Sequence, residues 1–512
     1  MVLWGGLRPI VSQIAIDVFS LLGLSYATLT KTDRPSNSLA LVAACSLTIV
    51  TAGISNRWTI TLPMVPIVIL QAFRRVIVKV TRSTETSSVQ RLSRWLPAMV
   101  TLGSMLIIIG SASLTILFPA VELPPVSGPY RVGVADFFLS VDLELPDTCT
   151  IHGNESEQHV SVKILYPTLE ETSIVPYLHP DSAIEFCRHT MRFGAPPPLK
   201  EFGWLLHTWR LTGLRARRNA KPLPASEIDS FPLVSFSHGL GGTADIYSYQ
   251  TMALAARGYV VLLVNHNDGS APVVRHVNGS LSSFDYKIGK LAAEGNHTEY
   301  VRLRRQKTDH RVEELISATE AFLALNEDDI PELSQAGVSF RNRLKNVTFM
   351  GHSFGGATAL TAAKRRPDLA SAVIAHEPAV NWMPDDARRS LFSTSGVGYD
   401  AFGLDNGDEE DIDTSIHDVD MLILFSHEWR EKKWGFSDIL EDMHRTGKLG
   451  TPKSELFVIE AAHHSEFSDT CMLTPVWLAR STNLTGSRNP VETAKEIEEK
   501  SFAFLQKVHS QR

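Results

Sequence analysis

Long runs of apolar residues are concentrated in the first 118 positions of this 512-residue chain. Residues 96–118 carry no charged side chain over 23 positions, which as a helix spans a hydrocarbon core of roughly 30 Å. Weaker candidates precede it at 10–29, 39–54 and 58–73. The segment 10–29 could instead be a signal peptide. Because further apolar segments follow it, a transmembrane helix explains it better. The pattern predicts an N-terminal membrane domain, residues 1–118, with up to four transmembrane helices.

After residue 118 the long apolar runs give way to a proline-rich stretch and then to short apolar runs. The stretch "PAVELPPVSGP" contains four prolines and predicts a stiff stalk over 119–130. Beyond it, short apolar runs typical of buried strands alternate with longer helical stretches, which predicts a mostly parallel sheet covered on both faces in an α/β domain, 131–512. The predicted strands lie at 160–166, 233–236, 260–264, 347–350, 372–375, 421–425 and 456–459, and the predicted helices at 247–257, 302–325, 356–365 and 491–508. The acidic, glycine-rich stretch 396–420 is predicted to be a surface loop.

Composition narrows the function classes. The chain is 44% hydrophobic and 21% charged, with a net charge of −7. This mild acidity argues against nucleic-acid binding, which needs a basic patch or stripe. The chain has four cysteines, of which Cys45 lies in an apolar segment, and no C-x-x-C pair. No zinc or redox site is therefore predicted.

Charges around the apolar segments predict an orientation. The loop 74–94 carries six basic residues and one acid, Glu85, so it should stay in the cytoplasm. The segment 96–118 would then carry the rest of the chain to the opposite side of the membrane. Five N-x-S/T sequons agree with a lumenal or extracellular α/β domain; they are Asn154, Asn278, Asn296, Asn346 and Asn483.

Residues 350–356 read "MGHSFGG" and contain the pattern G-x-S-x-G centred on Ser353. In α/β-hydrolases this pattern forms a sharp turn between a strand and a helix, which exposes the serine hydroxyl. Here "NVTFM" predicts the strand and "ATALTAAKRR" the helix. The context favours a nucleophilic serine over a glycine-rich structural turn.

An acyl-transferring serine also needs backbone N–H groups to stabilise the oxyanion. The residue after the nucleophile, Phe354, supplies one. The second is expected from the loop in "LVSFSHGLGG", where a strand runs into glycines. Leu240 is the better candidate donor there, and Gly241 is the next.

The base and the acid should follow the serine in the order carboxylate, then histidine. The last predicted strand leads into "AAHHSEFSD", which makes His463 or His464 the candidate base. Glu377 and Glu428 each follow a predicted strand, and the residues alone do not separate them. Two further acids lie deeper in a loop, Asp385 and Asp386.

Four patches together resemble the platelet-activating factor acetylhydrolases of the plasma and intracellular type II kind: "FPLVSFSHGLGG", "GHSFGGAT", "HSEFSD" and "SFAFLQKVH". The resemblance extends from about residue 128 to the C-terminus. It implies an α/β-hydrolase fold with Ser353 as nucleophile and oxyanion donors at Leu240 and Phe354. It places the base at His464 and the acid at Glu377, where the family usually has Asp, with Glu428 as the fallback.

The implied reaction is a two-step hydrolysis of a short sn-2 acyl group, acetyl above all, from platelet-activating factor or related oxidised phospholipids, without metal or organic cofactor. The expected partners are the phospholipid and the membrane and not nucleic acid, while the oligomeric state is not indicated. Two other hypotheses are a carboxylesterase or dienelactone-type hydrolase acting on small soluble esters, and a hydrolase-fold binding module. A fluorophosphonate label on the serine separates the binding module from the enzymes.

The stretch 201–218, "EFGWLLHTWRLTGLRARR", places apolar residues at helical spacing before a basic cluster. The family resemblance implies an interfacial helix here, with Trp204 and Trp209 facing lipid. Its basic tail would consist of Arg215, Arg217 and Arg218. The alternative is a lid helix that packs its apolar face on the core.

Overall fold

The computed structural model describes residues 122–141, 143, 159–195, 200–325, 330–402, 404 and 414–509. The chain divides into two compact units, Met1–Ala120 and Val121–Arg512. The four predicted membrane segments fall in the first unit, outside the described residues. Among the helices that are described, none has both the length and the apolar character needed to cross a membrane.

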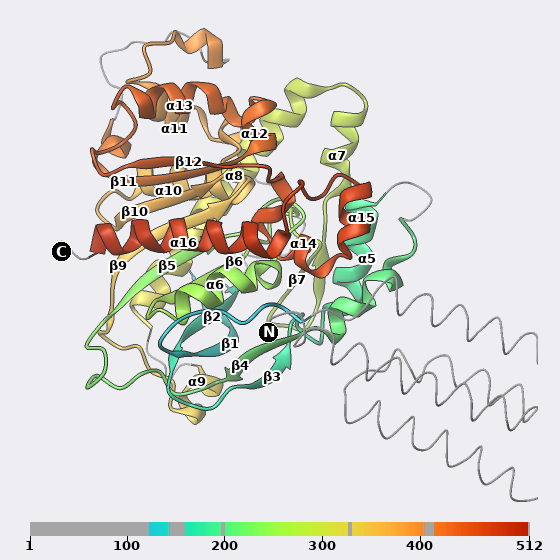
Figure 1. Cartoon of the computed structure of the whole chain (residues 1–512), viewed down its shortest axis with the longest axis vertical. Helices are drawn as coiled ribbons and strands as arrows, with labels where there is room; N and C mark the ends of the chain where they lie inside the picture. The colour runs from blue at the N-terminus through green and yellow to red at the C-terminus, as the bar shows by residue number, and fades with distance from the viewer. Residues whose placement is uncertain are drawn as a thin grey trace, which may run out of the picture. The chain divides into compact units, whose positions relative to one another are not determined.

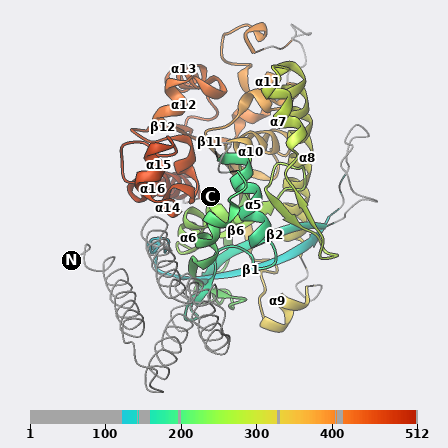
Figure 2. The same cartoon turned by 90° about the vertical axis from the view of Figure 1, so that its right-hand side faces the viewer.

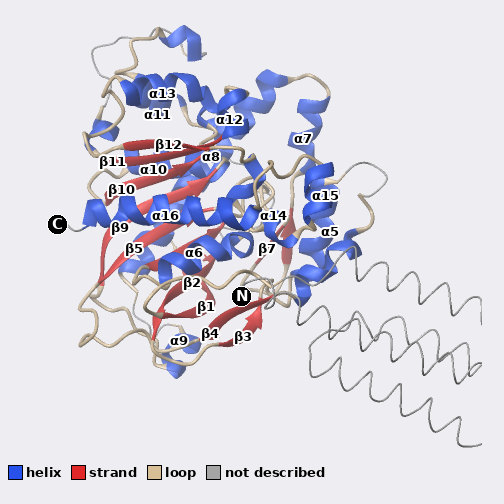
Figure 3. Cartoon of the chain, viewed as in Figure 1, coloured by secondary structure: helices blue, strands red, loops and turns tan. Residues whose placement is uncertain are grey.

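The second unit is built on a ten-stranded sheet with the order β12-β11-β10-β9-β5-β6-β2-β1-β4-β3 (Figures 1 and 3). Six neighbouring strands pair in parallel: β5 (Phe231–Ser237), β6 (Val260–Asn265), β9 (Leu344–His352), β10 (Ala370–His376), β11 (Asp420–Ser426) and β12 (Glu455–Ile459). The other four pair antiparallel except for β1 with β4: β1 (Arg131–Ser140), β2 (His159–Thr168), β3 (Ser173–Pro176) and β4 (Gly213–Arg218). A separate hairpin consists of β7 (Val273–Arg275) and β8 (Leu281–Ser283).

Helices cover both faces of this sheet. The helices α6 (Ser248–Ala255) and α16 (Pro490–His509) lie on one side, and α8 (His297–Leu323) lies on the other with α10 (Phe354–Arg365) packed against it (Figure 2). Burial on both faces explains why the central strands are mostly apolar, and all seven residues of β10 are buried. The α/β class and each of the seven strands predicted from the apolar runs are confirmed.

Shorter helices surround this framework. They are α5 (Ala183–Gly194), α7 (Tyr286–Ala293), α9 (Pro331–Ala336), α11 (Asp385–Phe392), α12 (His427–Glu431), α13 (Ser437–Arg445), α14 (Thr470–Leu473) and α15 (Val476–Ser481). The described parts of the stretch 396–420 form two short 3-10 helices, η6 (Tyr399–Phe402) and η8 (Ser415–Asp418), before β11 begins at Asp420.

The proline-rich segment lies on the α/β unit. From Glu122 to Ser127 it has no helix or strand, as its prolines predict. Leu123 is nevertheless buried within a core cluster, and the Tyr130 N–H donates to the Ala256 carbonyl at 3.0 Å. The described part of the predicted stalk is therefore packed against the domain and does not extend freely from it.

The prediction of one continuous helix over 201–218 is wrong. The segment forms a 3-10 helix, η2 (Gly203–Leu211), which ends before strand β4. Trp209 is only 3% exposed and its ring lies 6.3 Å from that of Phe186. The burial of Trp209 agrees with the alternative, in which the apolar face of the segment packs on the core.

The basic cluster after η2 is part of the sheet. In β4 the side chains alternate, so that Leu214 and Ala216 are buried while Arg215 and Arg217 point outward, and Arg218 is exposed at the end of the strand. Each arginine is paired with an acid: Arg215 with Glu122 at 3.6 Å, Arg217 with Glu170 at 3.6 Å, and Arg218 with Asp136 at 2.8 Å. Neutralisation by these acids removes the positive patch that the sequence suggested.

Replacement of Trp209 by Ala is expected to lower the free energy of unfolding by about 3–5 kcal/mol, because it removes a large buried side chain. Trp477, which is 52% exposed on α15, is the matched control, and Trp477→Ala should change stability by less than about 0.5 kcal/mol. Urea unfolding of both variants measures the difference. Unchanged stability of Trp209→Ala, combined with weaker vesicle binding, would instead support the interfacial hypothesis.

Candidate active site

Ser353 stands on a strained turn between β9 and α10. Its backbone has φ +56° and ψ −114°, a conformation that non-glycine residues rarely adopt. The turn is held at both ends, since the Ser353 N–H donates to the His376 carbonyl at 2.8 Å and the Ser353 carbonyl accepts from the Ala379 N–H at 3.0 Å. This strand–turn–helix geometry is the one that the G-x-S-x-G pattern predicts.

The two glycines of the pattern are required by close backbone packing. A Cβ at Gly351 would collide with the carbonyl of Gly355. A Cβ at Gly355 would collide with the carbonyl of Ser237, at the end of β5. Because these neighbours are backbone atoms, they cannot move aside as a flexible side chain could. The turn therefore sits directly against the end of the adjacent strand.

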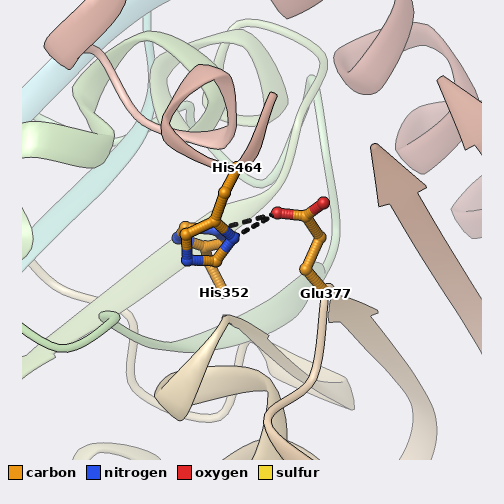
Figure 4. Close-up of side chains that lie close together, drawn as sticks. All are labelled: His352, Glu377 and His464. Atoms are coloured by element: carbon orange, nitrogen blue, oxygen red, sulfur yellow. Dashed lines mark hydrogen bonds and ion pairs between the residues drawn. The ribbon is translucent and has the colours of Figure 1, made fainter. Parts of the chain in front are cut away.

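Glu377 and His464 are brought together from two different strand ends (Figure 4). Glu377 follows β10, and His464 begins the 3-10 helix η10 (His464–Phe467) after β12. The His464 Nδ1 and the Glu377 Oε2 form a short hydrogen bond. The second carboxylate oxygen, Oε1, accepts from the Ser426 N–H at 2.7 Å. With Nδ1 engaged in this way, the Nε2 of His464 is the nitrogen left for a reacting group.

The carboxyl of Glu377 is fully buried but remains ionised. Burial by itself raises the pKa of Glu377, but the neighbouring His464 and His352 outweigh it and lower the pKa to about 2. Glu377 also has a left-handed backbone, with φ +48°. The residue thus presents a fixed negative charge to His464 over the whole neutral pH range.

A second histidine, His352, also faces this carboxylate. Its Nε2 lies 3.6 Å from Glu377 Oε2, and its ring centroid lies 4.6 Å from that of His464 (Figure 4). Its Nδ1 lies 3.0 Å from the Tyr247 hydroxyl, which also accepts from the Gly239 N–H at 3.0 Å. Burial lowers the pKa of His352 to about 4, so the ring is neutral at pH 7. When the Tyr247 hydroxyl donates to Nδ1, the ring proton of His352 lies on Nε2, toward Glu377.

Aromatic side chains fix the ring of His464. The Trp429 ring stacks on it at 4.9 Å with an interplanar angle of 24°, on the helix α12. Trp434 approaches edge-on at 6.3 Å. The His464 side chain keeps 30% of its surface exposed. The base candidate is therefore held by these two rings and is still partly open to solvent.

The alternative acid, Glu428, holds the backbone of His464 and not its ring. Its Oε2 accepts from the His464 N–H at 3.0 Å, and its Oε1 accepts from Lys432 at 2.6 Å. Burial raises the pKa of Glu428, but the hydrogen bonds from Lys432 and His464 lower it overall. Of the two acids that the residues alone left open, only Glu377 contacts the imidazole.

The remaining candidates lie elsewhere. His463 directs its Nδ1 toward the Asn483 carbonyl at 3.2 Å. Asp385 pairs with Arg305 at 3.0 Å and with Arg388 at 2.6 Å, and Asp386 pairs with Lys364 at 3.2 Å. Neither aspartate is hydrogen-bonded to His464. These residues serve as surface or structural partners in the described part of the chain.

Two backbone N–H groups remain free for an oxyanion. Among the described residues, neither the Leu240 N–H nor the Phe354 N–H has a hydrogen-bond acceptor. The Gly241 N–H, in contrast, donates to the Ser270 carbonyl at 2.8 Å. The structure therefore leaves Leu240, and not Gly241, with an available donor.

A buried arginine holds this loop against the serine's helix. Arg311, on α8, is fully buried and donates to the hydroxyls of Ser270 at 2.6 Å, Ser237 at 3.0 Å and Thr358 at 3.2 Å. It also donates to the carbonyl of His238, two residues before Leu240. Thr358 belongs to α10, so Arg311 links the two elements that carry the free N–H groups.

The Ser353 hydroxyl is not hydrogen-bonded to His464 or to any other described residue. The structure thus joins Glu377 and His464 directly. Ser353 follows His352 in the chain, and the ring of His352 contacts that of His464. Sequence reasoning missed His352, Tyr247, Trp429 and Arg311. For His352 a signal was present, because it lies inside the "GHSFGG" motif.

His352, Glu377 and His464 bring donor atoms within 4.8 Å of one another, a set that in other proteins holds zinc. The short hydrogen bond between His464 and Glu377 uses two of these atoms directly. The arrangement as it stands suits proton transfer by an oriented imidazole.

The fold and this turn define a class. A mostly parallel sheet with a strained serine between a strand and a helix, followed in the chain by a carboxylate and a histidine at strand ends, is the architecture of the α/β-hydrolases. Residues 115–512 match the family described as platelet-activating factor acetylhydrolase, isoform II, and the chain belongs to that family.

Individual relatives are distant. The chain is 25% identical over 308 residues to the platelet-activating factor acetylhydrolase of Gallus gallus, covering 57% of this chain and 64% of the relative. It is 24% identical over 399 residues to that of Cavia porcellus, covering 76% and 78% respectively. It thus spans a little under two thirds of the chicken relative. A solved ferulic acid esterase from Streptomyces cinnamoneus is similar with a TM-score of 0.48 and 17% identity, covering 77% of this chain and 94% of that one.

Proposed function

We propose that this protein is a serine esterase that removes a short sn-2 acyl group, acetyl above all, from platelet-activating factor or related short-chain and oxidised phospholipids. The products are a lysophospholipid and a free carboxylic acid. The observation that carries the proposal is the oriented His464–Glu377 pair, whose histidine contacts the ring of His352 next to the strained Ser353, within a chain of this family. The curated names of the relatives support the choice of substrate class.

In the proposed first step, the Ser353 Oγ attacks the sn-2 carbonyl carbon while the Nε2 of His464 takes the hydroxyl proton. The Leu240 and Phe354 N–H groups donate to the developing oxyanion. The ester bond to the glycerol oxygen then breaks, and the imidazolium gives its proton to that oxygen. The lysophospholipid leaves, and Ser353 carries the acyl group.

In the second step, His464 takes a proton from water, and the resulting hydroxide attacks the acyl carbon. Collapse of this intermediate breaks the bond to Oγ, which regains a proton from His464. Glu377 keeps the imidazole in one tautomer and stabilises its positive charge in both steps. Because the pKa of Glu377 is about 2, this charge is available at any pH at which His464 can act as a base.

The test of this function is a rate profile on phospholipids of graded sn-2 chain length, from acetyl to palmitoyl, with a water-soluble ester for comparison. Preference for the 2-acetyl phospholipid supports the proposal. Rates that rise with chain length, or a clear preference for the soluble ester, would replace it by the carboxylesterase hypothesis. The inactive Ser353→Ala variant serves as the blank for contaminating hydrolases.

We further propose that residues 1–118 anchor the enzyme in a membrane and that the hydrolase unit lies on the lumenal or extracellular side. The charge-free segment 96–118 and the basic loop before it support this orientation. Three sequon asparagines are exposed on the hydrolase unit and are accessible for glycosylation: Asn278, Asn296 and Asn483.

Expression of the full chain in a eukaryotic host, followed by endoglycosidase and protease-protection assays, tests this topology. We expect the enzyme to gain electrophoretic mobility after deglycosylation and the hydrolase unit to resist protease in sealed microsomes. Absence of the mobility change, together with digestion from the cytosolic side, contradicts the topology without affecting the proposed reaction.

A further inference from the structure

Arg304, on α8, is a buried cation without a counter-ion. The residue is 2% exposed, and its guanidinium forms no hydrogen bond or ion pair with a described residue. Its Nε is completely buried and unpartnered. Burial of an unpaired charge is energetically expensive, and proteins normally compensate it with an acid or with hydrogen bonds. Such a group points to a ligand that completes it.

The other arginines near Arg304 each have a hydrogen-bond or ion-pair partner. Arg305 pairs with Asp385 at 3.0 Å, and Arg388 pairs with the same carboxylate at 2.6 Å. Arg311 lies 4.5 Å from the ring of Phe354 and donates hydrogen bonds to the His238 carbonyl and to Thr358 of α10. Arg304 approaches the same ring and has no such partner.

Three aromatic rings surround the Arg304 guanidinium. Its central carbon lies 5.0 Å from the ring centre of Tyr300, 5.4 Å from that of Trp382 and 5.9 Å from that of Phe354. These cation–π contacts stabilise the positive charge, but they do not provide hydrogen-bond acceptors for the N–H groups of the guanidinium. Those N–H groups form the planar fork that binds phosphate or carboxylate oxygens in a bidentate way.

This cage adjoins the reaction centre on two sides. Phe354 directly follows Ser353 and supplies one of the free oxyanion N–H groups. Trp382 ends the short helix η5 (Val380–Trp382), which follows Glu377 and packs against α8. In a glycerophospholipid the phosphorus lies only a few bonds from the sn-2 carbonyl carbon. A phosphate group bound at Arg304 is therefore well placed to hold that carbonyl near Ser353.

We propose that Arg304 and its aromatic cage form the anion subsite that binds the phosphodiester of the substrate. The inference rests on the proposed esterase function and adds to it the group that distinguishes a phospholipid from an uncharged ester. Binding of this group lowers KM and orients the ester, while the chemistry stays with Ser353 and His464.

The test compares Arg304→Met with Arg305→Met on two substrates that share a 2-acetyl ester. One is 1-alkyl-2-acetylglycerophosphocholine, and the other is the uncharged 1-alkyl-2-acetylglycerol. For Arg304→Met we expect kcat/KM on the phosphodiester to fall by roughly 10- to 100-fold, as for loss of a charged hydrogen bond. The fall on the uncharged ester should be at least about tenfold smaller. Arg305→Met, whose partner is Asp385, should change neither rate appreciably.

Equal losses on both substrates would overturn the proposal and assign Arg304 a structural role through Phe354. Unchanged rates on both would overturn it as well. If Arg304→Met does not fold, Arg304→Lys replaces it, because lysine keeps the charge but lacks the bidentate fork. For Arg304→Lys we expect a smaller loss that is again confined to the phosphodiester.

A binding measurement separates this inference from the proposed reaction. If the wild-type enzyme hydrolyses neither ester, the proposed function fails, and calorimetry still decides whether the anion subsite exists. Glycerophosphocholine should bind the wild-type protein, and Arg304→Met should weaken this binding by roughly tenfold or more. Binding of inorganic phosphate alone, without glycerophosphocholine, would reject the phosphodiester assignment. Equal affinity of both proteins for glycerophosphocholine would reject the subsite.

Discussion

Replacement of Ser353 by Ala is expected to remove esterase activity, with kcat falling by on the order of a millionfold, as for the loss of the serine from other triads. The described cysteines offer no substitute nucleophile. The two described thiols, Cys187 and Cys471, are buried, and burial raises the pKa of both, that of Cys187 to about 12. The oxyanion donors and substrate binding should sustain only a small residual rate.

The variant should keep its fold, because Ala retains the Cβ and removes a hydroxyl that has no hydrogen-bond partner among the described residues. Thermal melting of the variant is therefore the control for a rate measured by acetate release. Labelling with a fluorophosphonate provides a second readout, with modification of the wild type and none of the variant. Near-normal activity in a homogeneous Ser353→Ala preparation would contradict the nucleophile assignment and with it the proposed mechanism.

The central sheet was predictable because its strands are buried on both faces and therefore contain short continuous apolar runs. Strand β10, for instance, contains four apolar residues in a row, Ala372–Ala375, between the polar residues Ser371 and His376. The edge strands were harder. Strand β1 includes Gly133 and Asp136, which weaken its apolar pattern. In β4 the alternation of Leu214 and Ala216 with arginines was a strand signal of period two, masked by the helical spacing of the preceding segment.

The site was predictable where chemistry depends on local sequence, and not where it depends on distant contacts. The strained turn at Ser353 and the free N–H groups follow from glycine spacing between strand and helix. The choice between Glu377 and Glu428 as the acid could not be predicted from local sequence, because each residue follows a parallel strand. It depends on the left-handed backbone of Glu377 and on the positions of residues 49 and 87 places further along the chain, Ser426 and His464.

Glu377→Gln is expected to lower kcat by about ten-thousand-fold, the effect of neutralising the acid in a serine–histidine–carboxylate triad. The amide has nearly the same shape, but it lacks the charge that stabilises the imidazolium, and its N–H₂ group can force the wrong tautomer on His464. Glu428→Gln is the matched control. Because Glu428 contacts only the His464 backbone and Lys432, we expect its loss to reduce kcat by no more than about tenfold, as for one hydrogen bond to a charged group.

The pH dependence gives these two variants a second, independent comparison. The pKa of Glu377 is lowered to about 2 from an ordinary value of 4.5, so the carboxylate is ionised throughout the working range, and its contribution to stability is lost only as the pH falls from about 4.5 toward 2. Wild-type kcat profiles between pH 6 and 9 should therefore show no inflection from the titration of Glu377, and Glu377→Gln should lose rate throughout that range. A larger deficit in Glu428→Gln than in Glu377→Gln would reverse the assignment, because the charge that stabilises the imidazolium would then come from the carboxylate that touches only its backbone.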